Sequence, residues 1–501
     1  MLIKKVLLIN LPEEGACADF YTPSYTIGSF STYPPLGLLY IATAIKDKYP
    51  VEILDTVALK YSTEEIVKKI IEKAPDVLGI SIQTMRLYPA FEILNKVKKE
   101  LKNTITIIGG SHTAIYPIES INLPHVDYVI NGDGEYPLLN LLDALSQDDF
   151  EQIKSIKGLI LKDKTGQIIQ NPPNYQPINE IAIPDRSLLD YKYYYTAADD
   201  DEQVVTMISS RGCPFRCIFC DVQEKRYRAR SAESVVDEME YISQTFSNPI
   251  IHVFDDNFNL FRDRVLEICE EIQKRNLKLR WTTRARVHPL DEEMIINLKK
   301  AGLIRIHLGV ESGSEKSLKL MRKGIKKEQI INAFKLCKKY EIDTLAYFII
   351  GYSWETKKDI NATLKFIKKI SPDFILACTL YPCAKTDVYN ELLKTGVIDR
   401  DYWQEFVTNP IPNFKLPQYR NLKTKRYLDR KLDEIYLKFY CSPSFVWKNL
   451  TSKKKNNNEE NNKSSIAGLF FKVKLAFMII LSYLKNLFLE SIVFTEKNEI
   501  K

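Results

Sequence analysis

The sequence predicts an α/β protein: a doubly wound parallel sheet, then a partial (β/α)6 barrel, then a helical C-terminal region. Short runs of mostly aliphatic residues alternate with amphipathic stretches from residue 1 to about residue 395. This alternation is typical of parallel strands covered by helices on both faces. A turn-rich and aromatic-rich stretch between residues 170 and 200 interrupts it. We therefore expect two α/β domains, residues 1–180 and 200–395, followed by a helical region at 396–450.

The first domain has glycine-rich and polar loops after two of its expected strands. In a parallel sheet, ligands bind at the carboxyl ends of the strands, and glycine there lets backbone amides approach a large ligand closely. The loops are Gly109-Gly110-Ser111-His112 and Asn131-Gly132-Asp133-Gly134-Glu135. No G-x-G-x-x-G follows the first strand, so the loops give little support for a dinucleotide. The expected strands are 6–10, 51–55, 77–82, 104–108 and 128–130, and the expected helices are 36–48, 63–73, 87–101 and 136–145.

The second domain resumes the alternation with expected strands whose right-handed crossovers bend the sheet toward a barrel. Active residues of such barrels lie on the loops after the strands. Cys213, Cys217 and Cys220 follow the first of these strands, which puts them at the expected active rim. The expected strands are 204–209, 250–255, 279–283, 305–310, 344–350 and 374–380, and the expected helices are 232–246, 264–274, 291–301, 327–339 and 356–370.

The composition favours an intracellular protein and gives no sign of a nucleic-acid partner. The 501 residues carry a net charge of only +7, with both signs interspersed, so the charge alone indicates no nucleic-acid binding. The first ten residues read as a strand, without the pattern of a secretory signal. The nine cysteines include only one close group. We therefore expect a cytoplasmic protein in a reducing environment.

The C-terminal residues predict a linker and a tail. Residues 451–465 are of low complexity, rich in Lys, Asn and Glu, and predict a flexible linker. Residues 466–501 include an amphipathic helical stripe whose longest uncharged run, 475–484, is too short to span a membrane. Such a helix either lies in a membrane interface with its lysines snorkelling or docks on protein, and both interpretations stay open.

The spacing C-x3-C-x2-C of Cys213, Cys217 and Cys220 indicates an iron–sulfur cluster. Three thiolates so spaced reach different irons of one small cube, and a cube with four irons then keeps one iron open for a further ligand. The alternatives are a structural zinc site and plain packing. A zinc site needs four ligands, and no second cysteine pair or histidine pair lies near the array. Glycine and proline around Cys213 also favour a shaped loop over a helix or strand.

These residues resemble the radical S-adenosylmethionine (SAM) superfamily. The resemblance implies that the three cysteines bind a [4Fe-4S] cluster, that SAM chelates its fourth iron, and that Phe219 packs near the adenine. Asp255 and Asp256, after the second barrel strand, resemble a segment that contacts SAM, where a carboxylate can pair with the ammonium group; a helix cap is the alternative. Glu311 and Ser312 resemble the segment that holds the SAM ribose and carboxylate. Arg284 and Arg286 follow the third barrel strand, and they are either ligand contacts or ion-pair partners.

The N-terminal domain resembles the Rossmann-like cobalamin-binding domains that are fused to radical SAM barrels. The motif D-x-H-x-x-G, which elsewhere supplies an axial histidine to cobalt, is absent, and we interpret His112 as a loop residue rather than a cobalt ligand. The alternative is a sheet domain that no longer binds cobalamin. The residues that carry the resemblance, and that it implies for cobalamin, are Pro35, Leu36, Gly37, Gly109, Gly110, Gly132, Gly134 and Glu135.

The resemblance implies a cobalamin-dependent methyltransferase that cleaves SAM to a 5′-deoxyadenosyl radical and methylates an unactivated carbon of a small-molecule or lipid-like substrate. An electron donor such as flavodoxin or ferredoxin would supply the electron. A radical cyclase or rearrangement enzyme is the first alternative, with cobalamin as a redox relay or absent, and a membrane-surface or partner-binding protein with a vestigial site is the second. Cys378 and Cys383 lie near the expected rim, where the family's Pro-x-Pro-Gly-Thr turn is replaced; they either face substrate or pack as apolar residues.

Overall fold

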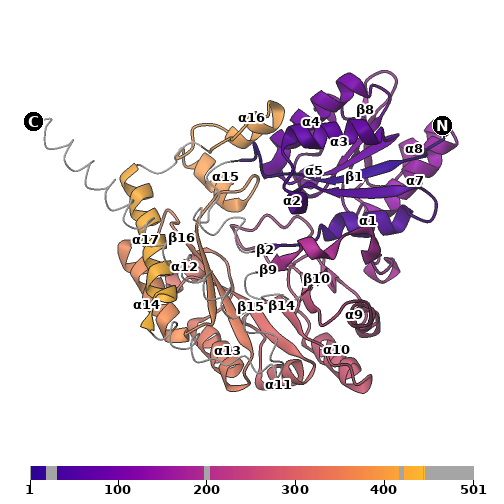
Figure 1. Cartoon of the computed structure of the whole chain (residues 1–501). Helices are drawn as coiled ribbons and strands as arrows, with labels where there is room; N and C mark the ends of the chain where they lie inside the picture. The colour runs from indigo at the N-terminus through magenta and orange to yellow at the C-terminus, as the bar shows by residue number, and fades with distance from the viewer. Residues whose placement is uncertain (1, 18–30, 197–202, 417–421, 444, 446–501) are drawn as a thin grey trace, which may run out of the picture.

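A computed structural model describes residues 2–17, 31–196, 203–416, 422–443 and 445 of the chain. Figure 1 shows two α/β units, with the N-terminal sheet and its helices in indigo and the second sheet in magenta to orange. The expected linker 451–465 and tail 466–501 lie outside the described residues. No helix within the described part has the length and hydropathy to cross a membrane.

The first sheet contains the five expected parallel strands and a hairpin that we did not predict. Its order is β3-β1-β4-β5-β6-β7-β8. The strands from β3 to β6 are parallel, whereas β7 pairs antiparallel with β6, and β8 pairs antiparallel with β7. The strand bounds are β1 Val6–Asn10, β3 Val51–Asp55, β4 Val77–Ser81, β5 Ile105–Gly109, β6 Tyr128–Ile130, β7 Leu159–Lys162 and β8 Ile168–Gln170.

Alternating residues of β1 explain why this sheet is covered on both faces. Leu7 and Ile9 belong to one apolar core and Val6 and Leu8 to another, because successive side chains of a strand point to opposite faces. The helices α3 and α4 supply the first core, and α1 and α7 the second. The bounds are α1 Leu36–Ile45, α2 Thr56–Leu59, α3 Thr63–Lys73, α4 Leu87–Glu100, α5 Ser111–Ile115, α6 Pro117–Asn122, α7 Glu135–Ser146 and α8 Phe150–Ser155.

The second sheet confirms the partial barrel, with six parallel strands in the order β10-β13-β14-β15-β16-β17. Its outer face packs under the connecting helices, whose apolar stripes form the largest core of the chain. The strands are β10 Val204–Met207, β13 Ile250–Val253, β14 Trp281–Ala285, β15 Leu303–Glu311, β16 Asp343–Ile350 and β17 Phe374–Thr379. The helices are α9 Ala232–Thr245, α10 Arg262–Lys274, α11 Glu292–Lys300, α12 Glu315–Leu320, α13 Lys327–Lys339 and α14 Lys357–Ile370.

Two short antiparallel ribbons join the domains. Strand β2 (Ser31–Thr32) pairs with β9 (Tyr195–Thr196), and β11 (Ser210–Arg211) pairs with β12 (Arg228–Ala229). The connecting stretch also contains single helical turns, and Tyr191 and Tyr194 from it are buried in the core of the barrel. The described part of the segment between the expected domains is therefore packed against the barrel. The turns are η2 Ile178–Glu180, η3 Arg186–Leu188 and η4 Tyr191–Tyr193, and η1, Thr84–Arg86, precedes α4.

The C-terminal helices contact both domains. Helices α15 (Asp387–Lys394) and α16 (Tyr402–Thr408) place Tyr389, Trp403 and Phe406 in the core of the first sheet. Helix α17 (Leu422–Tyr440), which is yellow-orange in Figure 1, packs on β17. The chain thus returns to the N-terminal domain around residue 384, before it covers the last strand of the barrel.

Two tyrosines of α17 satisfy the free edge of β17. The Tyr436 hydroxyl accepts from the Ala377 N–H at 3.0 Å and donates to the Ala377 carbonyl at 2.9 Å. One helical turn later, the Tyr440 hydroxyl does the same for Ile375, at 3.1 and 2.8 Å. An open strand edge is a template for pairing with other chains, so these hydroxyls take the place of a further strand.

We expect Tyr436→Phe to lower the free energy of unfolding of the barrel by about 1–3 kcal/mol, because it leaves buried backbone groups of Ala377 without partners. Urea titration followed by far-UV circular dichroism measures the change. Tyr427→Phe on the same helix is the matched control, since the Tyr427 hydroxyl is buried and has no hydrogen-bond partner among the described residues. Equal losses for the two variants would contradict the edge role of Tyr436.

Candidate active site at the domain junction

The cysteine loop runs from Gly212 to Cys220, directly after β11, at the carboxyl end of β10. Backbone hydrogen bonds fix it: Cys213 N–H donates to the Glu224 carbonyl at 3.0 Å, and Ile218 N–H to the Met321 carbonyl at 3.2 Å. All three thiols are partly exposed, whereas Cys17, Cys269 and Cys337 are buried. The three cysteines of the array are therefore presented from a fixed loop, and the buried cysteines pack as apolar residues.

Cationic groups surround this loop. The Arg286 guanidinium lies 3.8 Å from the Phe215 ring centroid, with Nη1 3.9 Å from Cys217 Sγ. Lys323 Nζ lies 6.0 Å from the Phe219 ring centroid. Burial raises the pKa of the Cys220 thiol to about 11 and also raises the pKa of Cys213. Thiolates in such a loop need a bound metal centre to stay deprotonated, and the nearby cations favour a negatively charged thiolate-bound group.

The donor set of the loop fits an iron–sulfur cube. Three thiols on one short loop, each partly exposed, match the way a cube is held through separate irons. Within the described residues, no three His, Cys, Asp or Glu side chains have the arrangement that holds a single metal ion. A cube does not require side chains that converge on a single metal ion, because each thiolate binds a different iron.

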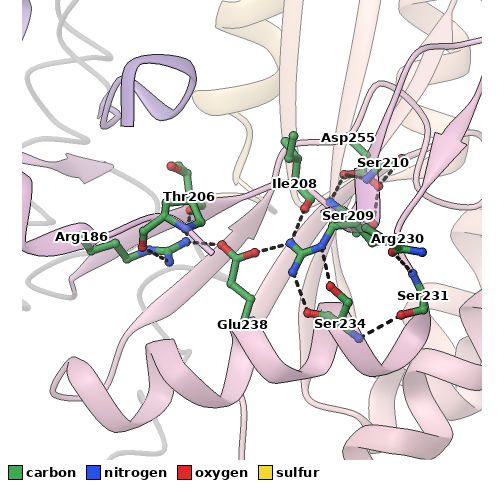
Figure 2. Close-up of polar contacts among 12 residues, drawn as sticks. Arg186, Thr206, Ile208, Ser209, Ser210, Arg230, Ser231, Ser234, Glu238 and Asp255 are labelled. Atoms are coloured by element: carbon green, nitrogen blue, oxygen red, sulfur yellow. Dashed lines mark hydrogen bonds and ion pairs between the residues drawn. The ribbon is translucent and has the colours of Figure 1, made fainter. Parts of the chain in front are cut away.

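A buried ionic network fixes the strand end from which the loop starts. Figure 2 shows Glu238 of α9 between Arg186 and Arg230. The two arginines also donate to the Thr206 and Ile208 carbonyls, at 2.9 and 3.0 Å. All three charged side chains are buried, so the end of β10 is held by charges that have no access to water.

Asp255 is placed differently from the SAM contact that its motif predicts. It is buried, and its two oxygens accept from the backbone N–H groups and the hydroxyls of Ser209 and Ser210, at 2.5 to 3.0 Å. Its carboxylate is therefore fully used within the protein. Asp256, in contrast, is exposed and accepts only from Gly212 N–H at 3.0 Å among the hydrogen bonds of the described residues. The geometry favours a positioning role for Asp255 and leaves Asp256 as the candidate ligand contact.

Glu311 and Ser312 lie at the end of β15, and both are buried. Glu311 has a left-handed backbone, φ 65°, and pairs with Lys323 at 2.6 Å. The Ser312 hydroxyl lies 3.2 Å from the Thr363 hydroxyl. A left-handed conformation is costly for a residue with a side chain, and strain of this kind is concentrated at functional sites. Phe219, Tyr352 and Lys323 gather at the same rim, and Lys323 pairs with Glu311, so two of the predicted SAM residues, Phe219 and Glu311, lie around one lysine.

A cavity of about 430 Å³ lies between the carboxyl ends of β1, β4, β5 and β6 and the rim of the barrel. Every residue predicted for cobalamin lines it except Pro35. The barrel side contributes Ile208, Arg211 and Phe254, which the sequence did not mark because nothing in their local spacing sets them apart. Arg284, expected as a ligand contact or an ion-pair partner, lines the cavity as well, and so does Asp133 of the glycine-rich loop.

The glycines of the cavity wall are needed for close packing. Gly110 and Gly132 have φ of 102° and 97°, and a Cβ on Gly132 would lie 2.1 Å from the Asn174 carbonyl oxygen. Gly37 in the first turn of α1 has, among the described residues outside its own helical turn, no atom within 4 Å of its ideal Cβ position. The wall therefore has an open depression at Gly37, as the cradle of a large ligand requires.

His112 is not part of this cavity. It lies in α5, fully buried, with Nδ1 3.1 Å from the Thr84 hydroxyl. Burial lowers its pKa to about 3, so the ring stays neutral. None of the residues that line the cavity is a histidine, and the interpretation of His112 as a residue outside cobalt coordination stays a prediction.

The inner face of the barrel sheet has a polar and an apolar half. His307, on β15, lies 3.1 Å from the Tyr347 hydroxyl through Nδ1, and Arg284 is in register with His307. On β17, Leu376 is 37% exposed, although its neighbours Ile375 and Ala377 are buried under α17. Leu376 is in register with Tyr347, so an uncovered apolar side chain lies beside the polar group.

The remaining rim cysteines, Cys378 and Cys383, are half-buried. Burial raises the pKa of Cys378 and of Cys383 to about 12, and Cys378 Sγ lies 3.6 Å from the Phe348 carbonyl oxygen. Neither thiol has the depressed pKa of a reactive cysteine. Packing is therefore the interpretation that the surroundings favour.

Comparison with known proteins supports both domains. The radical SAM superfamily matches residues 207–367, and the B12 binding domain matches residues 26–142. The chain is 30% identical over 456 residues to an uncharacterized methyltransferase of Pyrococcus horikoshii, covering 90% of this chain and 95% of that protein. It is 29% identical over 387 residues to the anaerobic magnesium-protoporphyrin IX monomethyl ester cyclase of Rubrivivax gelatinosus, covering 74% of this chain and 69% of that one.

A solved structure shares the fold. The radical S-adenosylmethionine methyltransferase TsrM from Kitasatospora setae, with cobalamin and a [4Fe-4S] cluster bound, aligns with a TM-score of 0.63 and 19% identity over 79% of each chain. Because so much of each chain aligns, the shared fold includes the barrel and the sheet domain together.

Proposed function

The chain belongs to the radical SAM enzymes that carry an N-terminal B12-binding domain, and on that premise we propose that it is a cobalamin-dependent methyltransferase acting on an unactivated carbon of a small molecule. The observation that carries the proposal is the cavity, whose wall combines glycines of the sheet domain with Arg211, which precedes the cysteine loop. The same cavity thus adjoins both the predicted cobalamin site and the predicted iron–sulfur site. The related methyltransferase from Pyrococcus, which matches along almost its whole length, supports the same reaction class.

The chain's own residues have defined roles in this proposal. When bound, the [4Fe-4S] cluster with SAM supplies one-electron radical chemistry, and cobalamin supplies a methyl carrier. Cys213, Cys217 and Cys220 would hold the iron–sulfur cluster. Arg286, whose Nη1 lies 3.9 Å from Cys217 Sγ, would offset the negative charge of that cluster. The Asp256 carboxylate, beside the loop, is proposed for the SAM ammonium.

Glu311, Ser312 and Phe219 are proposed for the remainder of SAM. Their common position at the carboxyl ends of the barrel strands supports this assignment. The predicted cobalamin residues are proposed to contact cobalamin through the cavity that all but Pro35 line. Flavodoxin or ferredoxin is proposed as electron donor, and contact of the C-terminal tail with a membrane surface is a further proposal.

The inner face of the barrel points to an amphipathic small molecule as substrate. Arg284 is exposed and has no ion pair within the described residues, and its guanidinium lies 4.2 Å from the Phe254 ring centroid. Leu376 offers an uncovered apolar surface on the same sheet face. We propose that an anionic group of the substrate pairs with Arg284 while its apolar part packs on β16 and β17.

A labelled methyl group distinguishes methyl transfer from cyclisation. We expect anaerobic holoenzyme given SAM with a deuterated methyl group to produce a product that retains that label, because the methyl group originates in SAM. Mass spectrometry of the product measures it. The second candidate function is a radical cyclase, which the cyclase from Rubrivivax among the relatives favours. An unlabelled product with a new ring would overturn the methyltransferase proposal and support the cyclase.

Gly37→Leu should weaken cobalamin binding by filling the depression in the cavity wall. We expect overpacking of about 1–3 kcal/mol, which corresponds to roughly 5- to 150-fold in Kd. The backbone tolerates the change, because Gly37 lies in a helix, outside the left-handed region, and leucine is a good helix former. Equilibrium dialysis with hydroxocobalamin measures the Kd, and Gly37→Ala, which adds one methyl group, should show a smaller loss. Equal affinity of the Leu variant and the wild type would place cobalamin elsewhere.

A further inference from the structure

Four charged side chains meet where the cysteine loop contacts the first domain. Arg211 Nη1 lies 2.7 Å from Asp133 Oδ1, and Nη2 lies 2.6 Å from Glu135 Oε1. Arg228 Nη1 lies 2.6 Å from Asp133 Oδ2. These four residues, here called the interdomain ion cluster, balance two positive charges with two negative ones, and none has a side chain more than 18% exposed.

The two arginines hold the cysteine loop at its first ligand. Arg211 and Arg228 are paired residues of the β11–β12 ribbon. Gly212 follows with φ 84°, and a Cβ there would lie 2.2 Å from the Arg226 carbonyl oxygen. Its N–H donates to Asp256, so no freely rotating residue separates the Arg211 anchor from Cys213. A displacement of Arg211 must therefore be transmitted to the first thiolate of the array.

The two carboxylates belong to the wall of the cavity. Asp133 and Glu135 lie in the loop whose glycines line it, and Asp133 N–H donates to the Asn174 carbonyl at 2.7 Å. The Arg211 side chain also lines the cavity, with its guanidinium 5.3 Å from the Tyr40 ring centroid. One guanidinium is thus part of the cavity wall and the anchor of the cysteine loop.

We propose that the interdomain ion cluster couples the two cofactor sites, with Arg211 as the positioning residue. Separating the two loops would leave charges unpaired in a poorly solvated junction, which is strongly unfavourable. An iron–sulfur cluster bound to Cys213 holds Arg211, two residues earlier, in its place in the cavity wall. Its binding therefore raises the cobalamin affinity of the cavity, and cobalamin stabilises the iron–sulfur cluster by the same factor. This inference rests on the proposed function for the identity of both ligands.

The coupling is measured as a ratio of two dissociation constants. Full-length protein, prepared anaerobically, is split into a cluster-loaded form and a form stripped by a chelator, and the Kd for hydroxocobalamin is determined for each by equilibrium dialysis. We expect the loaded form of the wild type to bind about tenfold more tightly or better, within the usual range of coupling between sites. The electron paramagnetic resonance spectrum of the reduced cluster, with and without cobalamin, gives a second readout that does not depend on activity.

Variants separate coupling from simple destabilisation. The double variant Arg211→Gln with Asp133→Asn removes one charge of each sign, so that the interdomain ion cluster stays neutral. For this variant the ratio of the two dissociation constants should fall close to one. Arg211→Lys keeps the charge but loses the bidentate fork, so an intermediate ratio is expected. Arg322→Gln is the control, because Arg322 pairs at the surface with Asp387 beside the same loop, and its ratio should match the wild type.

The outcomes distinguish this inference from the proposed function. A wild-type ratio of one overturns the coupling whatever the variants do, and so does a double variant that keeps the wild-type ratio. Either result, with cobalamin still bound, leaves the proposed function intact. A chain that binds no cobalamin in either form overturns both proposals.

Discussion

Replacing Cys213, Cys217 and Cys220 together by alanine is expected to abolish the cluster and, with it, all reductive cleavage of SAM. The three thiols are the only ligands that the loop offers, and they are partly exposed rather than packed in a core. Their loss therefore removes the metal centre without opening a cavity in the fold. Anaerobic reconstitution followed by iron and sulfide analysis, visible absorbance and chromatography of 5′-deoxyadenosine measures the result.

Cys441→Ala is the matched control for the cysteine variant. Cys441 lies just after α17, with intermediate exposure and away from the loop, so this variant should reconstitute as the wild type does. Circular dichroism should show the same helix content in both variants, because the loop is held by backbone hydrogen bonds to Met321 and Glu224 rather than by its thiols. A triple variant that retained iron and still formed 5′-deoxyadenosine would exclude the assigned cluster site.

The fold was predictable where local pattern and long-range pairing agree. Buried parallel strands appear as apolar runs between helical stretches, and the parallel strands of both sheets follow that pattern. The hairpin β7–β8 escaped prediction because its strands have only four and three residues, too few for a clear period. Its turn has a signal that a closer reading would use: Asp163 accepts from the N–H groups of Thr165 and Gln167, next to Gly166.

The candidate site was also predictable only where its features are local in the sequence. The cysteine spacing and the loop glycines are local features, so the sequence could single them out, and the glycines line the cavity. Their roles in binding cofactors stay predictions. The charged groups that join the elements are not local, since Arg186 and Glu238 are separated by 52 positions. The role of Asp255 was inferred from its motif, whereas its orientation depends on Ser209 and Ser210, 46 and 45 positions earlier. Spacing predicts which residues reach the rim, but not which way a carboxylate faces.

Glu238→Gln is expected to lower the free energy of unfolding by about 3–5 kcal/mol, the usual loss when one partner of a buried ionic group is removed. The glutamine keeps the size of the side chain and one acceptor oxygen, so the loss reports the missing charge rather than a cavity. Arg186 and Arg230 would both stay buried without a carboxylate, since Glu238 is the only acid with which either forms an ion pair in the described residues. Urea titration of the anaerobic protein, followed by tryptophan fluorescence, measures the change.

Two companion variants show that the effect belongs to the buried charge. Glu240→Gln lies on the same helix, but Glu240 pairs with Arg275 near the surface, so a loss of at most about 1 kcal/mol is expected. Arg186→Met leaves Glu238 and Arg230 as a neutral couple and should cost less than Glu238→Gln, although it removes more hydrogen bonds. If Arg186→Met proved the more damaging variant, hydrogen bonding to the Thr206 carbonyl would dominate over charge balance. Because this carboxylate holds the strand end before the cysteine loop through both arginines, Glu238→Gln should also loosen the loop, and reconstituted iron per chain should fall together with stability.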